Sequence, residues 1–199
     1  MRRPMNPQGL LRFALAGLLL PATAGIASAE TAKSPQLRLS AVTVNLSGIG
    51  RARTERLEIV IDRWSTDAEH DKLLDVLKQK GSDKLLDALQ ATRPRAGYIR
   101  TTTSLAWDIQ YAREHSLPDG GRQIIFATDR PMSFFEVRNQ TRSSEYEFMW
   151  CEIHLDKNGI GEGKLAPLAK ISFDKAKNHV EIENYGIEPV RLTQVKVEK

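Results

Sequence analysis

The chain has 199 residues, with 29 basic and 25 acidic side chains and a formal net charge of +4. Three arginines fall in the first twelve positions, so the remainder carries 26 basic and 25 acidic residues. This balance argues against the clustered basic surface of a nucleic-acid-binding protein. The length suits one domain with a sizeable core, and the single cysteine excludes an intrachain disulfide.

The first 29 residues have the three parts of a cleavable secretory signal peptide. The arginines precede an apolar run over 13–20, and the small residues Ala27-Ser28-Ala29 follow. A membrane anchor is the alternative, but it needs roughly 20 apolar residues, and no later segment is apolar enough either. We expect cleavage after Ala29, a disordered lead-in over 30–36, and a periplasmic or secreted protein.

A helical hairpin is predicted at about 66–92, after two strands between 37 and 62. Thr66-Asp67-Ala68-Glu69 is a capping box, which starts the first helix. Gly81 ends that helix, and Pro94 follows the second. Each helix has one apolar stripe, formed by Leu73, Leu74 and Leu77 in the first and by Leu85, Leu86 and Leu89 in the second.

Strand patterns resume at Gly97 and continue to the end of the chain. They cover 105–111, 123–128, 146–153, 164–173, 179–185 and 190–197. A helix over 105–112 is a second interpretation of the first of these ranges. Short connections favour antiparallel neighbours. The predicted fold is therefore α+β: a single domain over 37–199, mainly an antiparallel barrel or sandwich of about eight strands, with one inserted helical hairpin.

The sequence contains no strong catalytic or metal-binding motif. Cys151 lies in a strand pattern and is interpreted as a small buried hydrophobic residue, with His154 on the opposite face. His154, Glu152 and His179 form a conceivable metal set, but surface hydrogen bonding is the commoner role. We predict no metal site and no cofactor. Asn158-Gly159 indicates a hairpin turn.

Charged and aromatic residues at strand ends are the weak candidates for ligand binding. They are Arg63, Trp64, Arg100, Asp129, Arg130, Glu136 and Arg138. We expect Arg63, Trp64, Asp129 and Arg130 to share a polar cluster at one end of the fold, because opposite charges at strand ends pair or face water. Such a cluster is either a structural brace for the hairpin or a pocket with one arginine left for an anionic group; the brace is favoured.

Four segments carry a resemblance to a known family. Arg63-Trp64-Ser65-Thr66-Asp67, Gly97-Tyr98-Ile99-Arg100, Ala127-Thr128-Asp129-Arg130-Pro131 and Glu136-Val137-Arg138-Asn139 resemble recurring blocks of a family of small exported bacterial proteins. That family has no assigned reaction or ligand. The resemblance implies an exported protein and gives no residue a role.

Two classes of function fit these observations. The first is a non-catalytic, exported binding or envelope-associated domain for a small apolar molecule or an envelope partner. The alternative is a small exported hydrolase that uses an acid–histidine pair, with Asp129 as the acid. An open apolar cavity favours the first class, and a cleft that gathers Asp129, Arg130 and a histidine favours the second.

Overall fold

The computed structural model describes residues 34–44, 54–130, 139, 142–185 and 188–198. The predicted signal peptide, most of the predicted lead-in, and the candidates Glu136 and Arg138 lie outside the described residues.

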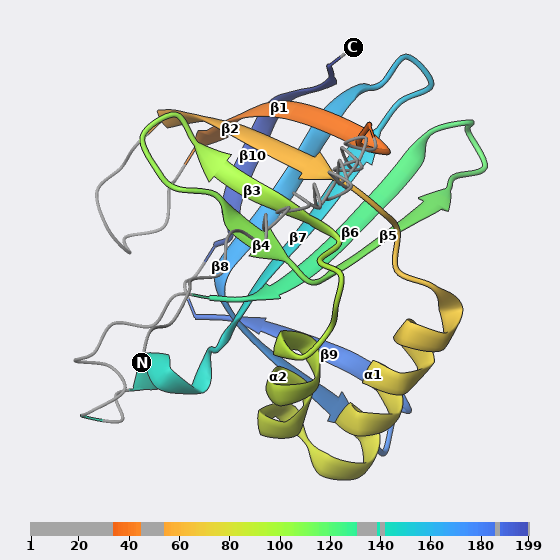
Figure 1. The fold of residues 1–199 in the computed structure, drawn as a ribbon, viewed down its shortest axis with the longest axis vertical. Helices are drawn as coiled ribbons and strands as arrows, with labels where there is room; N and C mark the ends of the chain where they lie inside the picture. The colour runs from red at the N-terminus through yellow and green to blue at the C-terminus, as the bar shows by residue number, and fades with distance from the viewer. Residues whose placement is uncertain (1–33, 45–53, 131–138, 140–141, 186–187, 199) are drawn as a thin grey trace, which may run out of the picture. The chain divides into compact units, whose positions relative to one another are not determined.

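Ten strands in these ranges form one antiparallel sheet, and nine of them curve into a nearly closed barrel (Figure 1). Along the sheet the order is β4-β3-β2-β1-β10-β8-β7-β6-β5, and β9 pairs with β8 off this path. The bounds are β1 Leu37–Val44, β2 Thr54–Ile61, α1 Asp67–Lys80, α2 Ser82–Gln90, β3 Gly97–Thr101, β4 Trp107–Ile109, β5 Tyr111–Ser116, β6 Arg122–Asp129, β7 Phe148–Leu155, β8 Ile160–Asp174, β9 His179–Asn184 and β10 Val190–Val197. The α+β prediction, with a helical hairpin inserted after the second strand, is confirmed.

The barrel closes where β4 meets β5 in the chain. Only Gln110 separates these two strands, although they stand at opposite ends of the sheet order. The Thr128 hydroxyl of β6 donates to the backbone oxygen of Asp108 in β4 at 2.6 Å. The Trp107 indole donates to the backbone oxygen of Asp129 at 2.8 Å. The backbone at Gln110 and these two hydrogen bonds therefore connect the two ends of the sheet.

The predicted single strand over 105–111 is wrong in detail. The chain pairs with β3 up to Ile109 and with β6 from Tyr111, so one run of alternating residues serves two strands. Leu105, at the start of the predicted range, is 94% exposed, whereas Ile109 is fully buried. This change of partner is one reason why ten strands are found where about eight were expected.

Alternate residues of the strands fill the barrel. Phe126, Ile59 and Leu192 are fully buried there, together with Cys151. Burial raises the pKa of the Cys151 thiol well above its ordinary value, so the thiol stays protonated. His154 is exposed. The interpretation of Cys151 as a buried hydrophobic residue is confirmed.

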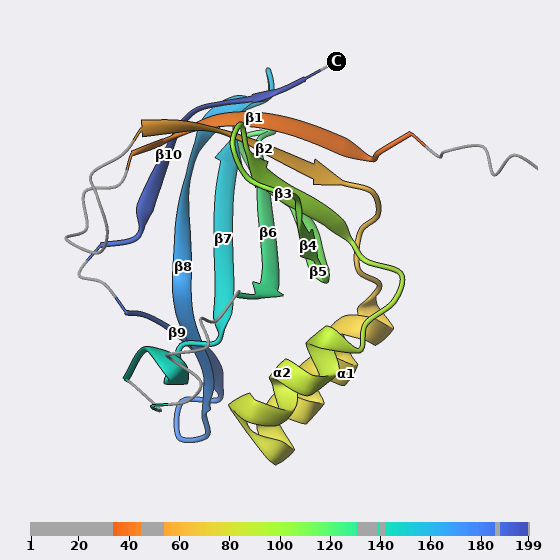
Figure 2. The ribbon, with the colours of Figure 1, turned by 60° about the vertical axis from the view of Figure 1, so that its left-hand side comes forward.

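The hairpin packs against the outside of the barrel and makes a second apolar cluster (Figure 2). Its helices contribute Leu73, Leu77, Leu85 and Leu89, and the strands contribute Phe148, Ala166, Ala169 and Ile171. The predicted capping box is present, since Thr66 and Glu69 each cap the other's backbone amide. Leu74 and Leu86, expected to be inward, are only half-buried.

Candidate functional site

An apolar groove of about 280 Å³ runs between the hairpin and the sheet. Its helical wall is formed by Leu73, Leu74, Leu77, Leu85 and Leu89, and its strand wall by Ile125, Ala127, Trp150, Ile171, Val180 and Ile182. Val180 and Ile182 on β9 are each 38% exposed. The groove therefore leaves large aliphatic side chains in contact with water, which is a feature of ligand or partner sites.

Three contacts fix α1 at the wall of the groove. Ser65, just before the helix, exchanges two hydrogen bonds with the backbone of Ala112 in β5, of 2.7 and 3.1 Å. At the first turn, Asp67 accepts from Arg113 at 2.7 Å. These bonds hold the start of α1 against the edge strand of the sheet.

One further contact holds the last residue of α2. The side chain of Gln90 donates to the carboxylate of Asp129 at 2.9 Å. Because the hairpin is held to the sheet at both ends, the groove between them has two fixed walls.

A polar pair lines the same groove. His70 Nδ1 of α1 and the Tyr111 hydroxyl of β5 are 2.8 Å apart, and their rings stack with centroids 6.0 Å apart. Burial raises the pKa of Tyr111, so its hydroxyl stays protonated and able to donate. His115 also lines the groove. These groups are available to a polar atom of a ligand.

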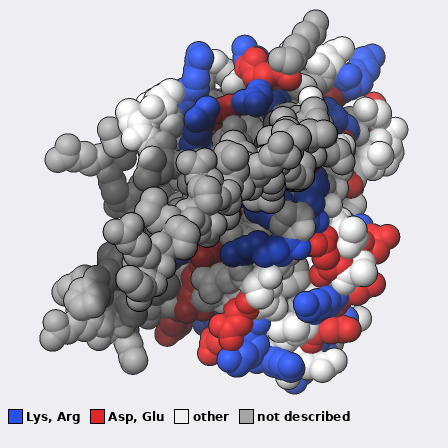
Figure 3. All heavy atoms as spheres, viewed as in Figure 1, with Lys and Arg blue, Asp and Glu red and all other residues white. Residues whose placement is uncertain are grey.

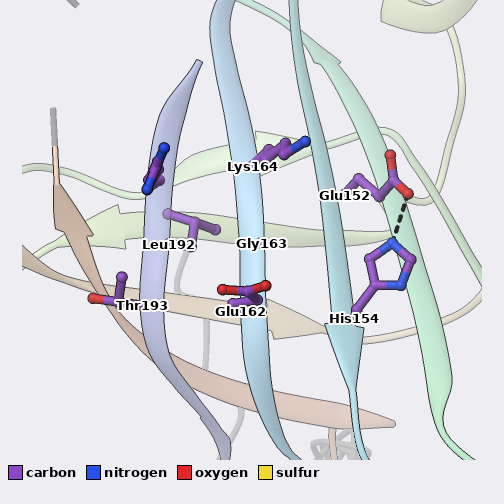
Figure 4. Close-up of a pocket in the computed structure, with 8 residues that line it drawn as sticks. Glu152, His154, Glu162, Gly163, Lys164, Leu192 and Thr193 are labelled. Atoms are coloured by element: carbon purple, nitrogen blue, oxygen red, sulfur yellow. Dashed lines mark hydrogen bonds and ion pairs between the residues drawn. The ribbon is translucent and has the colours of Figure 1, made fainter. Parts of the chain in front are cut away.

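A second cavity, of about 570 Å³, lies over β7, β8 and β10. It is lined by Glu152, His154, Glu162, Gly163, Lys164, Arg191, Leu192 and Thr193 (Figure 4). Its charged side chains alternate with core residues such as Ile153 and Leu165, so they stand on the outer face of the sheet. This is the face on which the hairpin also packs, through Trp150 and Ala166.

Glu152 and His154 form an acid–histidine pair in this polar cavity. His154 Nε2 lies 2.7 Å from a carboxylate oxygen of Glu152, and Gln123 donates to the same oxygen at 2.7 Å (Figure 4). Partial burial raises the pKa of Glu152, but the hydrogen bonds from His154 and Gln123 outweigh it and leave the pKa below its ordinary value. Glu152 is thus ionised and already engaged.

The predicted cluster of Arg63 with Asp129 is wrong, because Arg63 pairs elsewhere. Its guanidinium bonds both carboxylate oxygens of Glu69, at 2.8 and 2.9 Å. Its remaining N–H groups reach the backbone oxygens of Pro94 and Trp64. All five donors are thereby used, and Trp64 packs against the barrel core. Arg63 is a brace for the hairpin, with Glu69 as its partner.

We expect Glu69→Gln to lower the free energy of unfolding by about 0.5–1 kcal/mol at pH 7, because the pair is partly exposed. The bond from Arg63 is the main cause of the lowered pKa of Glu69. Because the pKa is lower in the folded state, ionised Glu69 stabilises the folded protein at pH values above the ordinary glutamate pKa of about 4.3. This stabilisation is lost as the pH falls through the pKa of the folded state. Denaturant unfolding from pH 7 to pH 3 should therefore show the two proteins converging in acid; a constant difference would contradict the pairing.

Asp129 and Arg130, which are neighbours in the chain, have described contacts with residues other than Arg63. Asp129 accepts from Gln90 and Thr128, and its described contacts include no histidine. Arg130 is buried, and its Nε donates to the backbone oxygen of Tyr146.

Arg100 stands apart from Asp129 and Arg130 in its contacts. It pairs with Glu58 of β2 and lies over the Tyr98 ring. On the described part of the face in Figure 3, basic and acidic side chains are interspersed.

Sequence reasoning missed the residues of both cavities, apart from the hairpin stripes, His154 and Glu152. Within the described ranges, no three histidine, cysteine or carboxylate side chains are grouped to hold a metal ion, so the conceivable set with His179 is not formed.

No helix in the described ranges has the length and apolar character to cross a bilayer. Comparisons with protein families, curated proteins and solved structures find no match for this chain.

Proposed function

We propose that this chain is an exported binding domain that holds one slender apolar chain, such as an alkyl chain, in the groove under the hairpin. The observation that carries the proposal is the groove itself. It has two fixed walls, its lining is aliphatic and aromatic, and Val180 and Ile182 remain partly exposed at β9. Export is supported by the signal-peptide pattern of the first 29 residues.

The dimensions of the groove favour a small ligand. At about 280 Å³ it is near the lower end of ligand pockets, and it has room for roughly nine atoms the size of a water molecule. His70, Tyr111 and His115 supply a few polar groups among many apolar ones, which is the usual composition of a small-molecule site. An alkyl chain with a single polar end matches this lining.

The alternative of a hydrolase has weaker support. The acid–histidine pair in the cavity is Glu152–His154 rather than one with Asp129. The hydroxyl in the lining of that cavity belongs to Thr193, which donates to the backbone oxygen of Val42 at 3.3 Å. A nucleophile activated by the histidine is not seen among these described contacts, so the binding function is preferred.

Calorimetric titration with straight-chain alcohols from hexanol to dodecanol tests the proposal. We expect affinity to rise about fourfold for each added methylene, since burying one contributes about 0.8 kcal/mol. The rise should stop near ten carbons, when the groove is full. Ile182→Asp should weaken decanol binding at least about tenfold, because the bound alkyl chain would remove water from an unpaired carboxylate.

Ile160→Asp is the matched control. Ile160 is 58% exposed on β8 and does not line the groove, so the same substitution there should leave decanol affinity unchanged. If the wild-type protein bound no alcohol, or if both variants bound decanol as tightly as wild type, the groove would not be the binding site.

A further inference from the structure

A single row of side chains joins the apolar groove to the polar cavity. Ile125 of the groove stands opposite Glu152, Glu152 opposite Lys164, and Lys164 opposite Arg191. Directly opposed residues of antiparallel strands share a face. With strands about 4.8 Å apart, Lys164 lies roughly 10 Å and Arg191 roughly 14 Å from Ile125 across the sheet.

The two cations of this row lack close partners. Within the ranges that the structure describes, neither Lys164 nor Arg191 has a side-chain hydrogen bond or ion pair. They stand directly opposite each other on β8 and β10, so they share the outer face of the sheet. Both line the cavity of about 570 Å³. A bound anion would supply the partner that both cations lack.

Among the described residues, the neighbouring carboxylates form no close ion pair with either cation. Glu152 is occupied by Gln123 and His154, and Figure 4 shows the Lys164 side chain extending from β8 toward β7. Lys164 lowers the pKa of Glu152 from a distance, without a close ion pair. Glu162 stands opposite His154, one position further along the same face of β8. Among the described residues, Lys164 and Arg191 thus remain without a close ion pair, in a lining that also holds Glu152 and Glu162.

We propose that Lys164 and Arg191 hold the anionic head of the ligand whose chain lies in the groove. This inference rests on the proposed function and adds the ligand class: a single-chain amphiphile with a negatively charged head, such as a carboxylate. The apolar tail lies beside Trp150 and Ile125, and the head reaches across Glu152 to the two cations. Binding gives both cations charge-assisted bonds to the anionic head.

Decanoate and decanol differ only in the head, and they separate the two proposals. At pH 7.5 and low salt, we expect the double variant Lys164→Gln, Arg191→Gln to bind decanoate about five- to twentyfold more weakly than wild type. Its affinity for decanol should stay within about twofold of wild type. Raising the ionic strength should weaken decanoate binding to wild type more than to the double variant, because exposed charges are screened.

The double variant Lys72→Gln, Lys157→Gln is the control, since it makes the same change of net charge at exposed positions outside both cavities. It should bind decanoate like wild type. Equal decanoate affinity in the Lys164/Arg191 variant and wild type would overturn the anionic site, while decanol binding that depends on Ile182 would leave the groove proposal intact. Failure of wild type to bind either compound would overturn both.

Discussion

Replacing Leu89 with alanine is expected to lower the free energy of unfolding by about 2–5 kcal/mol. Leu89 is 2% exposed and packs in the cluster that joins the hairpin to Phe148 and Ile171. Truncation removes apolar contacts and leaves a cavity, since the hairpin is tied to the sheet at both of its ends and has limited freedom to close the gap. Urea unfolding of the purified variant measures this loss.

Leu74→Ala is the matched substitution on the same hairpin. Leu74 is half-buried and faces the groove, so its truncation should cost clearly less, about 1 kcal/mol. If the two variants lost equal stability, or if Leu89→Ala cost under about 1 kcal/mol, the hairpin would not be docked as the structure has it.

The second large effect is expected from Gly97→Ala at the start of β3. Gly97 stands opposite Ile61, and a Cβ at this position would lie 2.0 Å from the backbone oxygen of Val60. Such an overlap with the backbone of β2 forces the strands apart, because no flexible side chain can yield instead. We expect a loss of about 3 kcal/mol or more, at the upper end of the range for overpacked cores.

Gly120→Ala makes the same chemical change in open space. Gly120 has a φ of +80° and nothing within 4 Å of its ideal Cβ, so only the backbone conformation opposes alanine there. This control should cost about 1 kcal/mol. Thermal unfolding compares the two variants; a smaller effect at Gly97 than at Gly120 would contradict the close pairing of β2 and β3.

Local chemistry in the sequence was sufficient to predict the hairpin and most strands. Thr66 and Glu69 have the spacing of a capping box, and the leucines repeat at helical intervals, so these features depend on neighbours in the chain. The break at Gln110 was not predictable in the same way. Its cause is a change of pairing partner, from β3 to β6, which depends on residues far away in the sequence.

The candidate site was less predictable than the fold. Arg63 was predicted to brace the hairpin, but with Asp129 as its partner. Its partner in the structure is Glu69, which the sequence had assigned to the capping box. Glu69 performs both roles, since it caps the helix and pairs with Arg63. Lys164 and Arg191 lie 27 positions apart in the sequence, and they become neighbours only because β8 pairs with β10. One signal was available for the groove: Val180 and Ile182 alternate with Glu181 and Glu183 on β9, a pattern that predicts one apolar strand face.

Nuclear magnetic resonance of protein with labelled isoleucine methyl groups gives the most direct test of the groove as the binding site. With decanol bound, we expect intermolecular nuclear Overhauser effects from the alkyl chain to Ile125, Ile171 and Ile182, which line the groove. Ile59 and Ile124 fill the barrel interior and should show none. Contacts of the chain with Ile59 or Ile124, and none with the three groove residues, would place the ligand inside the barrel and contradict the account.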